Sequence, residues 1–275
     1  MFTLINKIED LSVLNQEFLT KPFIAVDTEF RRTTKDNMRL SLLQINDGEE
    51  IYLIDAIAIG DPGNEANFLN STVVTKIFHS CKEDLEAVYS WTKERMENIY
   101  DTQIANSFLN GDYSISYQAL VENELGIFLD KKETRSNWIR RPLSDAQLKY
   151  AALDVEYLIH LYSEQKNELI KSDKLEWLEQ DIEKLINQTF TRDFVPYDIK
   201  RCISKSEEDY LLKEMNKIVL SISSRNKINP TLFFSKKNQK DFLRKVLADG
   251  IANACSDITM WRRDLIEKSI LDLLK

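Results

Sequence analysis

The chain has 275 residues, of which 43% are hydrophobic and 30% are charged, with a net charge of -8; this excludes a disordered chain and suffices for one large domain with a small appendage. Its 6 glycines and 5 prolines exclude collagen-like and low-complexity sequences, and its 3 widely spaced cysteines argue against a disulfide framework or a cysteine zinc site. No apolar run has the length of a membrane-spanning helix, and charged residues interrupt the N-terminal region where a signal peptide needs an apolar segment, so we expect a cytoplasmic protein without membrane association.

The first hundred residues show the pattern of a β-sheet. A short helix is expected over 9–20 and a second over 82–93, where apolar residues recur at helical spacing. An Asp-Gly turn signal before residue 50 indicates that the first three strands form an antiparallel meander. The expected strands cover residues 23–29, 39–46, 50–55, 73–79 and 99–102.

The chain from residue 116 onward is almost entirely helical in pattern. One long helix is expected over 144–167, with Ser144 as its N-cap, and another over 172–189. The segment 191–206 contains Pro196 and has no clear periodicity, which is typical of a linker. Three or more helices follow, over about 207–223, 238–248 and 261–274. We therefore predict an α/β domain over 1–190, a linker over 191–206 and a small all-helical domain over 207–275.

Charge divides along the same boundary. Residues 201–275 contain 15 Lys/Arg and 10 Asp/Glu, a net charge of +5, whereas residues 1–200 contain 22 and 35, a net charge of -13. Seven basic residues and a single acid fall within 225–245. A basic tail on an acidic body is typical of a protein that binds a phosphate chain at one end and metal ions at the other, although a solvated lysine-rich helix face explains the pattern equally well.

Two acidic residues end the first apolar strand. Asp27 and Glu29 are two positions apart, so their side chains point to the same face of the strand. Two like charges at the edge of a core repel each other, and a lysine, an arginine or a divalent cation is expected between them. A solvent-exposed strand end is the simpler interpretation of this pair taken alone.

Three further residues carry candidate chemistry. Tyr150 and Asp154 are four positions apart on the expected long helix and share one face of it, among apolar neighbours. Asp84 follows the fourth expected strand and lies in the first turn of a helix, where the helix dipole alone favours an acid. Four carboxylates could together hold two divalent cations about 3.5–4 Å apart, the arrangement used for in-line phosphodiester cleavage.

These motifs, taken in order, resemble the DEDD 3′–5′ exonuclease superfamily in its tyrosine-bearing subclass (DEDDy), and within it the ribonuclease D family. The likeness covers about residues 1–190 and rests on VDTEF, HSCKEDL and YAALDVEYL, supported by RLSLLQI, YDTQIA and KKETRSNWIRRPLSDAQLKY. The C-terminal part more loosely resembles a helicase-and-RNase-D C-terminal (HRDC) domain, through SRNKINPTLFFSKKNQKDFLR and WRRDLIEKSILDLL. The family commonly has two such domains, and the length after residue 200 allows one.

The resemblance implies a ribonuclease H-like mixed sheet flanked by helices, followed by a small all-helical HRDC-like domain that binds nucleic acid. It implies that two Mg²⁺ or Mn²⁺ ions are held by four carboxylates, while Tyr150 orients the attacking water, since a phenol is a poor base at neutral pH. The product would be a nucleoside 5′-monophosphate. The implied catalytic residues are Asp27, Glu29, Asp84, Tyr150 and Asp154.

The expected partners are single-stranded RNA 3′ ends, including tRNA precursors, and we expect a monomer. Candidate contacts to the terminal nucleotide are Thr28, Gln44, His79, Trp138 and Arg141, for each of which ordinary packing or charge balance is an equal alternative. A DNA exonuclease of the same superfamily, a catalytically silent nucleic-acid-binding module and an unrelated α/β domain are the competing interpretations. Retention of all five catalytic residues argues against the silent module.

Overall fold

The computed structural model describes residues 2–34, 37–129, 136–191 and 202–274. Contacts divide the chain into two compact units. The first runs to Gln103 and resumes over Ile115–Asn167, and the second combines Ile104–Ser114 with the chain from Glu168 onward. The division by contacts therefore lies before the expected boundary at residue 190, and the assignment of the two domains stays a prediction.

The first unit is built on a mixed sheet, as expected. Within the described ranges, six strands lie in the order β1-β4-β3-β2-β5-β6. The antiparallel meander β2–β3–β4 is confirmed, while β1 pairs with β4, and β5 with both β2 and β6, in parallel. The strands are β1 (Phe2–Ile5), β2 (Phe23–Thr34), β3 (Asn37–Asn46), β4 (Ile51–Asp55), β5 (Thr75–Phe78) and β6 (Ile99–Asp101).

Strand β2 is longer than the sequence predicts. It was expected to end at residue 29, yet it pairs with β3 as far as Thr34, with a register shift between Glu29 and Phe30. Backbone hydrogen bonds alone can continue a two-stranded ladder after the apolar alternation has stopped, and a shift of this kind bends the strand locally. The polar end of β2 therefore forms an exposed hairpin arm, while the strand's first half stays in the core.

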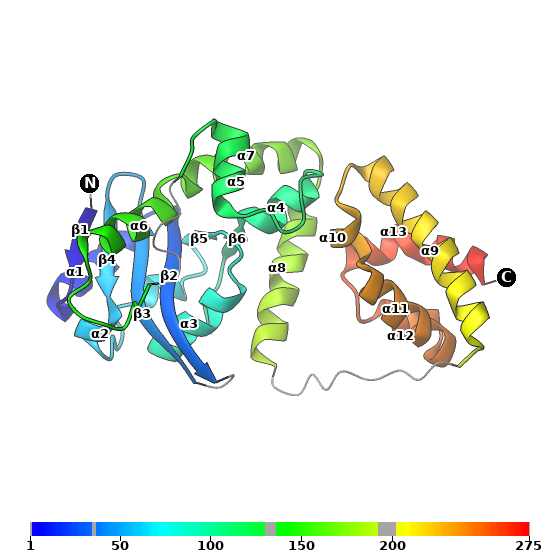
Figure 1. Cartoon of the computed structure of the whole chain (residues 1–275), viewed down its shortest axis with the longest axis horizontal. Coiled ribbons are helices and arrows are strands. Elements are labelled where there is room, and N and C mark those ends of the chain that lie inside the picture. The colour runs from blue at the N-terminus through cyan, green and yellow to red at the C-terminus, as the bar shows by residue number, and fades with distance from the viewer. Residues whose placement is uncertain (1, 35–36, 130–135, 192–201, 275) are drawn as a thin grey trace. The chain divides into compact units, whose positions relative to one another are not determined.

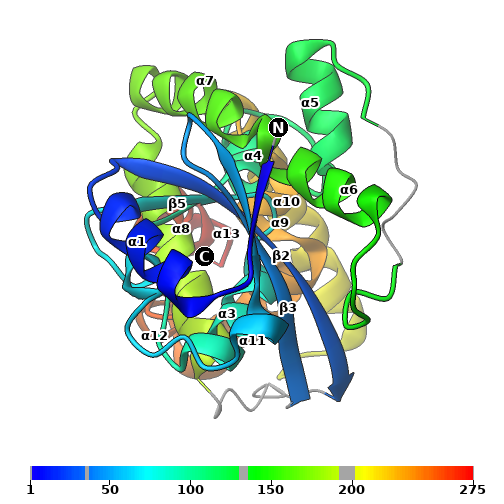
Figure 2. The same cartoon turned by 90° about the vertical axis from the view of Figure 1, so that its left-hand side faces the viewer.

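Helices cover both faces of the sheet (Figures 1 and 2). On one face, Phe18 of α1 packs against Tyr52 of β4, with ring centroids 5.4 Å apart. On the other, Leu53 of β4 packs with Ala151 of α6 and Trp138. Successive residues of a strand point to opposite faces, so α1 and α6 lie on opposite faces of the sheet, as Figure 2 shows.

The helix expected over 144–167 is two helices, so that prediction is wrong in its length. Ser144 is the N-cap, as predicted, with a full capping box to Gln147. The first helix, α6, ends at Glu156 because the Tyr157 N–H donates to the Tyr117 hydroxyl rather than to a helical carbonyl. The helices up to this region are α1 (Ile8–Phe18), α2 (Ala56–Ile59), the 3₁₀ helix η1 (Asn67–Leu69), α3 (Lys82–Thr92), α4 (Thr102–Phe108), α5 (Tyr117–Leu125), α6 (Asp145–Glu156) and α7 (Leu158–Lys171).

The second unit is helical around an aromatic core. Trp177 and Trp261 stack with centroids 5.1 Å apart, and Phe108 and Phe233 pack against Trp261. The three helices expected after residue 206 are confirmed as α9, α11 and α13; α9 already begins within the expected linker, whose residues 192–201 lie outside the described part. The helices are α8 (Leu175–Phe190), α9 (Lys205–Asn226), α10 (Pro230–Phe234), α11 (Lys236–Asp249), α12 (Ile251–Cys255) and α13 (Met260–Leu273). None of the helices in the described ranges has the length and apolar character to cross a membrane.

Candidate active site

Asp27 and Glu29 lie where β2 separates from β5. Ala25 is the last residue of β2 that pairs with β5, and β5 itself ends at Phe78. Both carboxylates are half-buried. The carboxyl ends of parallel strands are where ligands bind in open α/β sheets. The sequence pair is therefore not a solvent-exposed strand end but part of a partly enclosed edge of the sheet.

Asp84 reaches the same edge from the first turn of α3. Its side chain is only 7% exposed. The Thr28 hydroxyl of β2 donates a hydrogen bond to Asp84 Oδ1 at 2.5 Å. This bond joins the start of α3 to the strand that carries the first two acids, so its carboxylate is fixed by a tertiary contact as well as favoured by the helix dipole.

Helix α6 supplies Tyr150 and Asp154 from the face of the sheet opposite to α3. The Tyr150 hydroxyl lies near the Asp154 carboxylate and lowers its pKa, and the ring centroids of Tyr150 and Trp138 are 6.1 Å apart. Asn46 of β3 holds the end of the helix, because its Nδ2 donates to the carbonyls of Val155 (3.1 Å) and Glu156 (3.3 Å). Asn46 was missed at the level of sequence, although it alternates with Gln44 on the strand face that α6 covers.

The four carboxylates interact with one another. Burial raises the pKa of Asp27 well above its usual range, and the charges of Asp84, Asp154 and Glu29 raise it further. Burial, followed by the charges of Asp154 and Asp84, raises the pKa of Glu29 to about 9. Burial also raises the pKa values of Asp84 and Asp154 to about 7 each. Like charges held this close in a partly buried place destabilise one another, and a bound cation would remove that cost.

The carboxylate ligands fit a hard divalent cation whose coordination shell is completed by water and substrate. In the described part of the chain, no group of three or more His, Cys, Asp or Glu side chains is placed so that it could hold a metal ion. Mg²⁺ binds protein through one or two carboxylates and takes its other ligands from water and substrate phosphate. Oxygen ligands from separate elements around an open edge match that preference.

Two buried polar groups beside the carboxylates have open hydrogen-bonding capacity. Gln44 lies directly opposite Asp27 in the β2–β3 register and is completely buried. Among the described residues, neither its amide nitrogen nor its oxygen has a hydrogen-bond partner, and the same holds for Trp138 Nε1. Buried polar groups are normally paired, so these atoms suit a site that receives water or a polar ligand.

The other three predicted contact residues are engaged by the protein. Arg141 donates to both oxygens of Asp55 (2.6 and 2.7 Å) and to the backbone carbonyls of Ser41 and Trp138. The ring nitrogens of His79 hydrogen-bond to the Thr102 hydroxyl and the Ile115 carbonyl, and the Thr28 hydroxyl bonds to Asp84. Their contacts to a nucleotide stay predictions, and Arg141 is best explained as a brace for the segment before α6.

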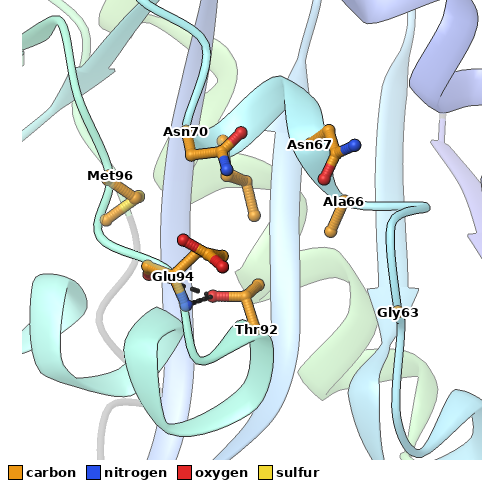
Figure 3. A pocket seen from close by; sticks show the side chains of 8 residues that line it. Gly63, Ala66, Asn67, Asn70, Thr92, Glu94 and Met96 are labelled. Carbon is orange, nitrogen blue, oxygen red and sulfur yellow. Dashed lines mark hydrogen bonds between the residues drawn. The ribbon is translucent and has the colours of Figure 1, made fainter.

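A separate pocket does not share this chemistry. It lies between the segment around η1 and the end of α3, lined among others by Asn67, Asn70, Thr92 and Glu94 (Figure 3). The Thr92 hydroxyl bonds to the backbone of Glu94, which is the one ionisable residue in the lining. This pocket contains none of the carboxylates of the candidate site.

A model of the 3′–5′ exonuclease family matches residues 2–170. Ribonuclease D of Shewanella sp. (strain ANA-3) is 36% identical over 185 residues, which make up 67% of this chain and 48% of that protein. The chain thus spans about half the length of the curated relatives it matches. The match covers the six strands and all five residues of the candidate site.

Solved structures share the fold at low identity. The crystal structure of Escherichia coli RNase D, described as an exoribonuclease involved in structured RNA processing, has a TM-score of 0.67 at 23% identity and covers 99% of this chain and 74% of its own. Brucella melitensis NrnC with bound Mg²⁺ has a TM-score of 0.58 at 24% identity, over 68% of this chain and 90% of its own. The α/β fold with a mixed sheet flanked by helices is therefore confirmed.

Proposed function

The chain belongs to the 3′–5′ exonuclease family, and we therefore propose that it is a metal-dependent exoribonuclease that removes nucleoside 5′-monophosphates from RNA 3′ ends. The observation that carries this proposal is the mutual electrostatic interaction of Asp27, Glu29, Asp84 and Asp154, which come from three separate elements of the fold. The names of the ribonuclease D relatives favour RNA over DNA, and 3′ ends of tRNA precursors and other small stable RNAs are the proposed substrates. We propose that the enzyme acts as a monomer.

The four carboxylates would hold two divalent cations, Mg²⁺ or Mn²⁺, with the RNA phosphate completing their coordination. Such ions, when bound, make a nucleophilic hydroxide available at neutral pH and stabilise the leaving 3′ oxyanion. Burial and the neighbouring carboxylates raise the pKa of Tyr150 above its usual range, so its phenol stays protonated. Tyr150 therefore orients the attacking water through its hydroxyl and does not act as a base.

The second unit would bind RNA through phosphates as an HRDC-like domain. Lys236, Lys237 and Lys240 project from the first turns of α11 and are exposed, while Arg225 and Lys227 at the end of α9 are exposed as well. Exposed basic side chains on two helices of one unit provide an electrostatic site that does not depend on RNA sequence.

The activity is tested with 5′-labelled single-stranded RNA and a matched DNA strand, each with Mg²⁺, Mn²⁺ or EDTA. The proposal expects stepwise shortening of the RNA from its 3′ end, lost in EDTA and in Asp154→Asn. Asp145→Asn is the matched control, because Asp145 is an exposed acid in the first turn of the same helix. Preferential degradation of DNA would identify the DNA exonuclease instead, and binding without degradation would identify a silent module.

The RNA-binding surface is tested by reversing charge without truncation. The triple variant Lys236→Glu/Lys237→Glu/Lys240→Glu should weaken RNA binding. The slope of log affinity against log salt concentration should become shallower by about one for each lost phosphate contact. The control is Lys213→Glu, because Lys213 is an exposed residue of α9 outside the basic segment 225–245. Unchanged affinity and salt slope in the triple variant would contradict RNA binding by this surface.

A further inference from the structure

The junction between α6 and α7 contains a side chain in place of a helical hydrogen bond. In an uninterrupted α-helix the Tyr157 N–H would donate to the Leu153 carbonyl. Here it donates to the Tyr117 hydroxyl at 3.1 Å, and that hydroxyl donates in turn to the Leu153 carbonyl at 3.2 Å. One phenol oxygen therefore separates a donor and an acceptor that would otherwise pair, which is a recognised cause of helix breaks.

The inserted hydroxyl comes from a well-fixed side chain. Tyr117 is the first residue of α5 and is 8% exposed. Its ring packs against the ring of His79, with centroids 5.8 Å apart. His79 is itself held by the Thr102 hydroxyl and the Ile115 carbonyl, each 2.9 Å away. The phenol thus belongs to a packed cluster built on β5, α4 and α5, and it has little freedom to follow α6 if that helix moves.

The break lies beside the third carboxylate motif. Leu153, whose carbonyl Tyr117 contacts, immediately precedes Asp154. On the sheet side, the Asn46 amide donates hydrogen bonds to the carbonyls of Val155 and Glu156. The last turn of α6 is therefore held from two directions by groups that do not belong to the helix. Without the inserted hydroxyl, the apolar periodicity of residues 144–167 favours one straight helix.

We propose that Tyr117 is a positioning residue: its hydroxyl stops α6 after Glu156 and so keeps the Asp154 carboxylate facing Asp27 and Glu29. This rests on the proposed function, because the orientation matters only if these carboxylates bind cations. Removing the hydroxyl leaves the Leu153 carbonyl and the Tyr157 N–H either to pair with each other, which straightens the helix, or to stay unpaired. Either change turns or loosens the segment that carries Asp154.

The test is Tyr117→Phe in the full chain, with binding of Mn²⁺ alone measured by calorimetry in the absence of RNA. Disturbing a group that orients a metal ligand typically costs about 10- to 100-fold in metal affinity, and a loss in this range is expected. Exonuclease activity should need correspondingly more Mn²⁺ and recover in part at saturation.

The matched control is Tyr100→Phe. Tyr100 is also a buried tyrosine, 5% exposed, and its hydroxyl has no hydrogen-bond partner among the described residues. This variant should bind Mn²⁺ like the wild type. If Tyr117→Phe is less stable, its titration is run in the cold with an osmolyte that favours the folded state, and circular dichroism verifies that it is folded.

The outcomes separate the two proposals. Wild-type protein that neither binds Mn²⁺ nor degrades RNA would remove the proposed function. A functional wild type together with a folded Tyr117→Phe variant of unchanged Mn²⁺ affinity would overturn the positioning of Asp154 by Tyr117, even if the variant melts at a lower temperature. Weaker Mn²⁺ binding confined to Tyr117→Phe would support it.

Discussion

Replacing Asp84 by asparagine should make the metal-free protein more stable while it abolishes activity. Asp84 is 7% exposed, and burial raises its pKa from 3.8 to about 7, against the opposing effect of the Thr28 hydrogen bond. The folded state therefore binds more protons than the unfolded state between these values. The stability that protonation of the Asp84 carboxyl contributes is fully present below about pH 4 and is lost as the pH rises through about 7.

The size of the effect follows from that shift. About three pKa units at ~1.4 kcal/mol each give an upper bound of about 4 kcal/mol at pH 8, which the Asp84→Asn variant would recover because an asparagine side chain carries no charge. The charge of Asp84 also raises the pKa values of Asp27 and Glu29, so part of the cost is shared between groups and the gain is smaller than this bound. For a chain of this length, 1 kcal/mol corresponds to about 2 °C in Tm, so Asp84→Asn should melt about 2–8 °C higher.

The assay is thermal unfolding at pH 5 and pH 8, in EDTA and in Mn²⁺, with Asp145→Asn as the control for loss of an exposed acid. The stabilisation should be largest at pH 8 in EDTA and fall to less than half of that value at pH 5, because the penalty on the folded state accumulates only above the unfolded-state pKa near 4. Mn²⁺ should stabilise the wild type by binding to its folded state, and it should stabilise Asp84→Asn less. The difference in Tm between the two proteins should therefore narrow or reverse in Mn²⁺. A variant that melts at or below the wild-type temperature at pH 8 in EDTA would refute the electrostatic account of the site.

Three further changes have defined expectations. Tyr150→Phe should lower the RNA degradation rate at saturating Mn²⁺ about 10- to 100-fold, which corresponds to the ~1.5–3 kcal/mol of a hydrogen bond to a charged group; an unchanged rate would contradict the orienting role of the Tyr150 hydroxyl. Burial lowers the pKa of Lys76 from 10.5 to about 7. Between pH 7 and pH 10 the free energy of unfolding of the wild type, measured in urea, should therefore rise by up to about 4 kcal/mol relative to that of Lys76→Met. The same difference between the two proteins at both pH values would contradict this. Arg262→Gln removes the guanidinium that donates to both oxygens of the half-buried Asp181 carboxylate, which keeps only the hydrogen bond from Trp261 Nε1. The free energy of unfolding in guanidinium should fall by about 3 kcal/mol; a loss below about 1 kcal/mol would mean that the pair does not stabilise the fold.

Local periodicity was enough to predict the parts of the site that lie within one element. The alternation in residues 23–46 and the Asp47-Gly48 turn predicted the meander, and with it the common face of Asp27 and Glu29. The spacing of four between Tyr150 and Asp154 predicted that they share a face of α6, where the Tyr150 hydroxyl lowers the pKa of the Asp154 carboxyl. In each case the interacting groups are close in sequence, so a pattern records them.

What the sequence could not indicate depends on distant partners. Arg141, a candidate nucleotide contact, is bound by Asp55, 86 residues away, and nothing in either local pattern links the two residues. The apolar periodicity of residues 144–167 continues through Tyr157, so only the hydroxyl of Tyr117, 40 residues earlier, explains why the helix stops there. The open amide of Gln44 likewise follows from its register opposite Asp27.

The order in which the chain supplies its carboxylates has a consequence during protein synthesis. Three of the four acids, on β2 and α3, belong to the first third of the chain, whereas Asp154 comes with α6 only after the sheet's strands have been made. A growing chain can therefore form its sheet on the ribosome before all four carboxylates are present. Under the proposed function, cleavage of the ribosomal and messenger RNA around it would have to wait until α6 has emerged and packed onto the sheet.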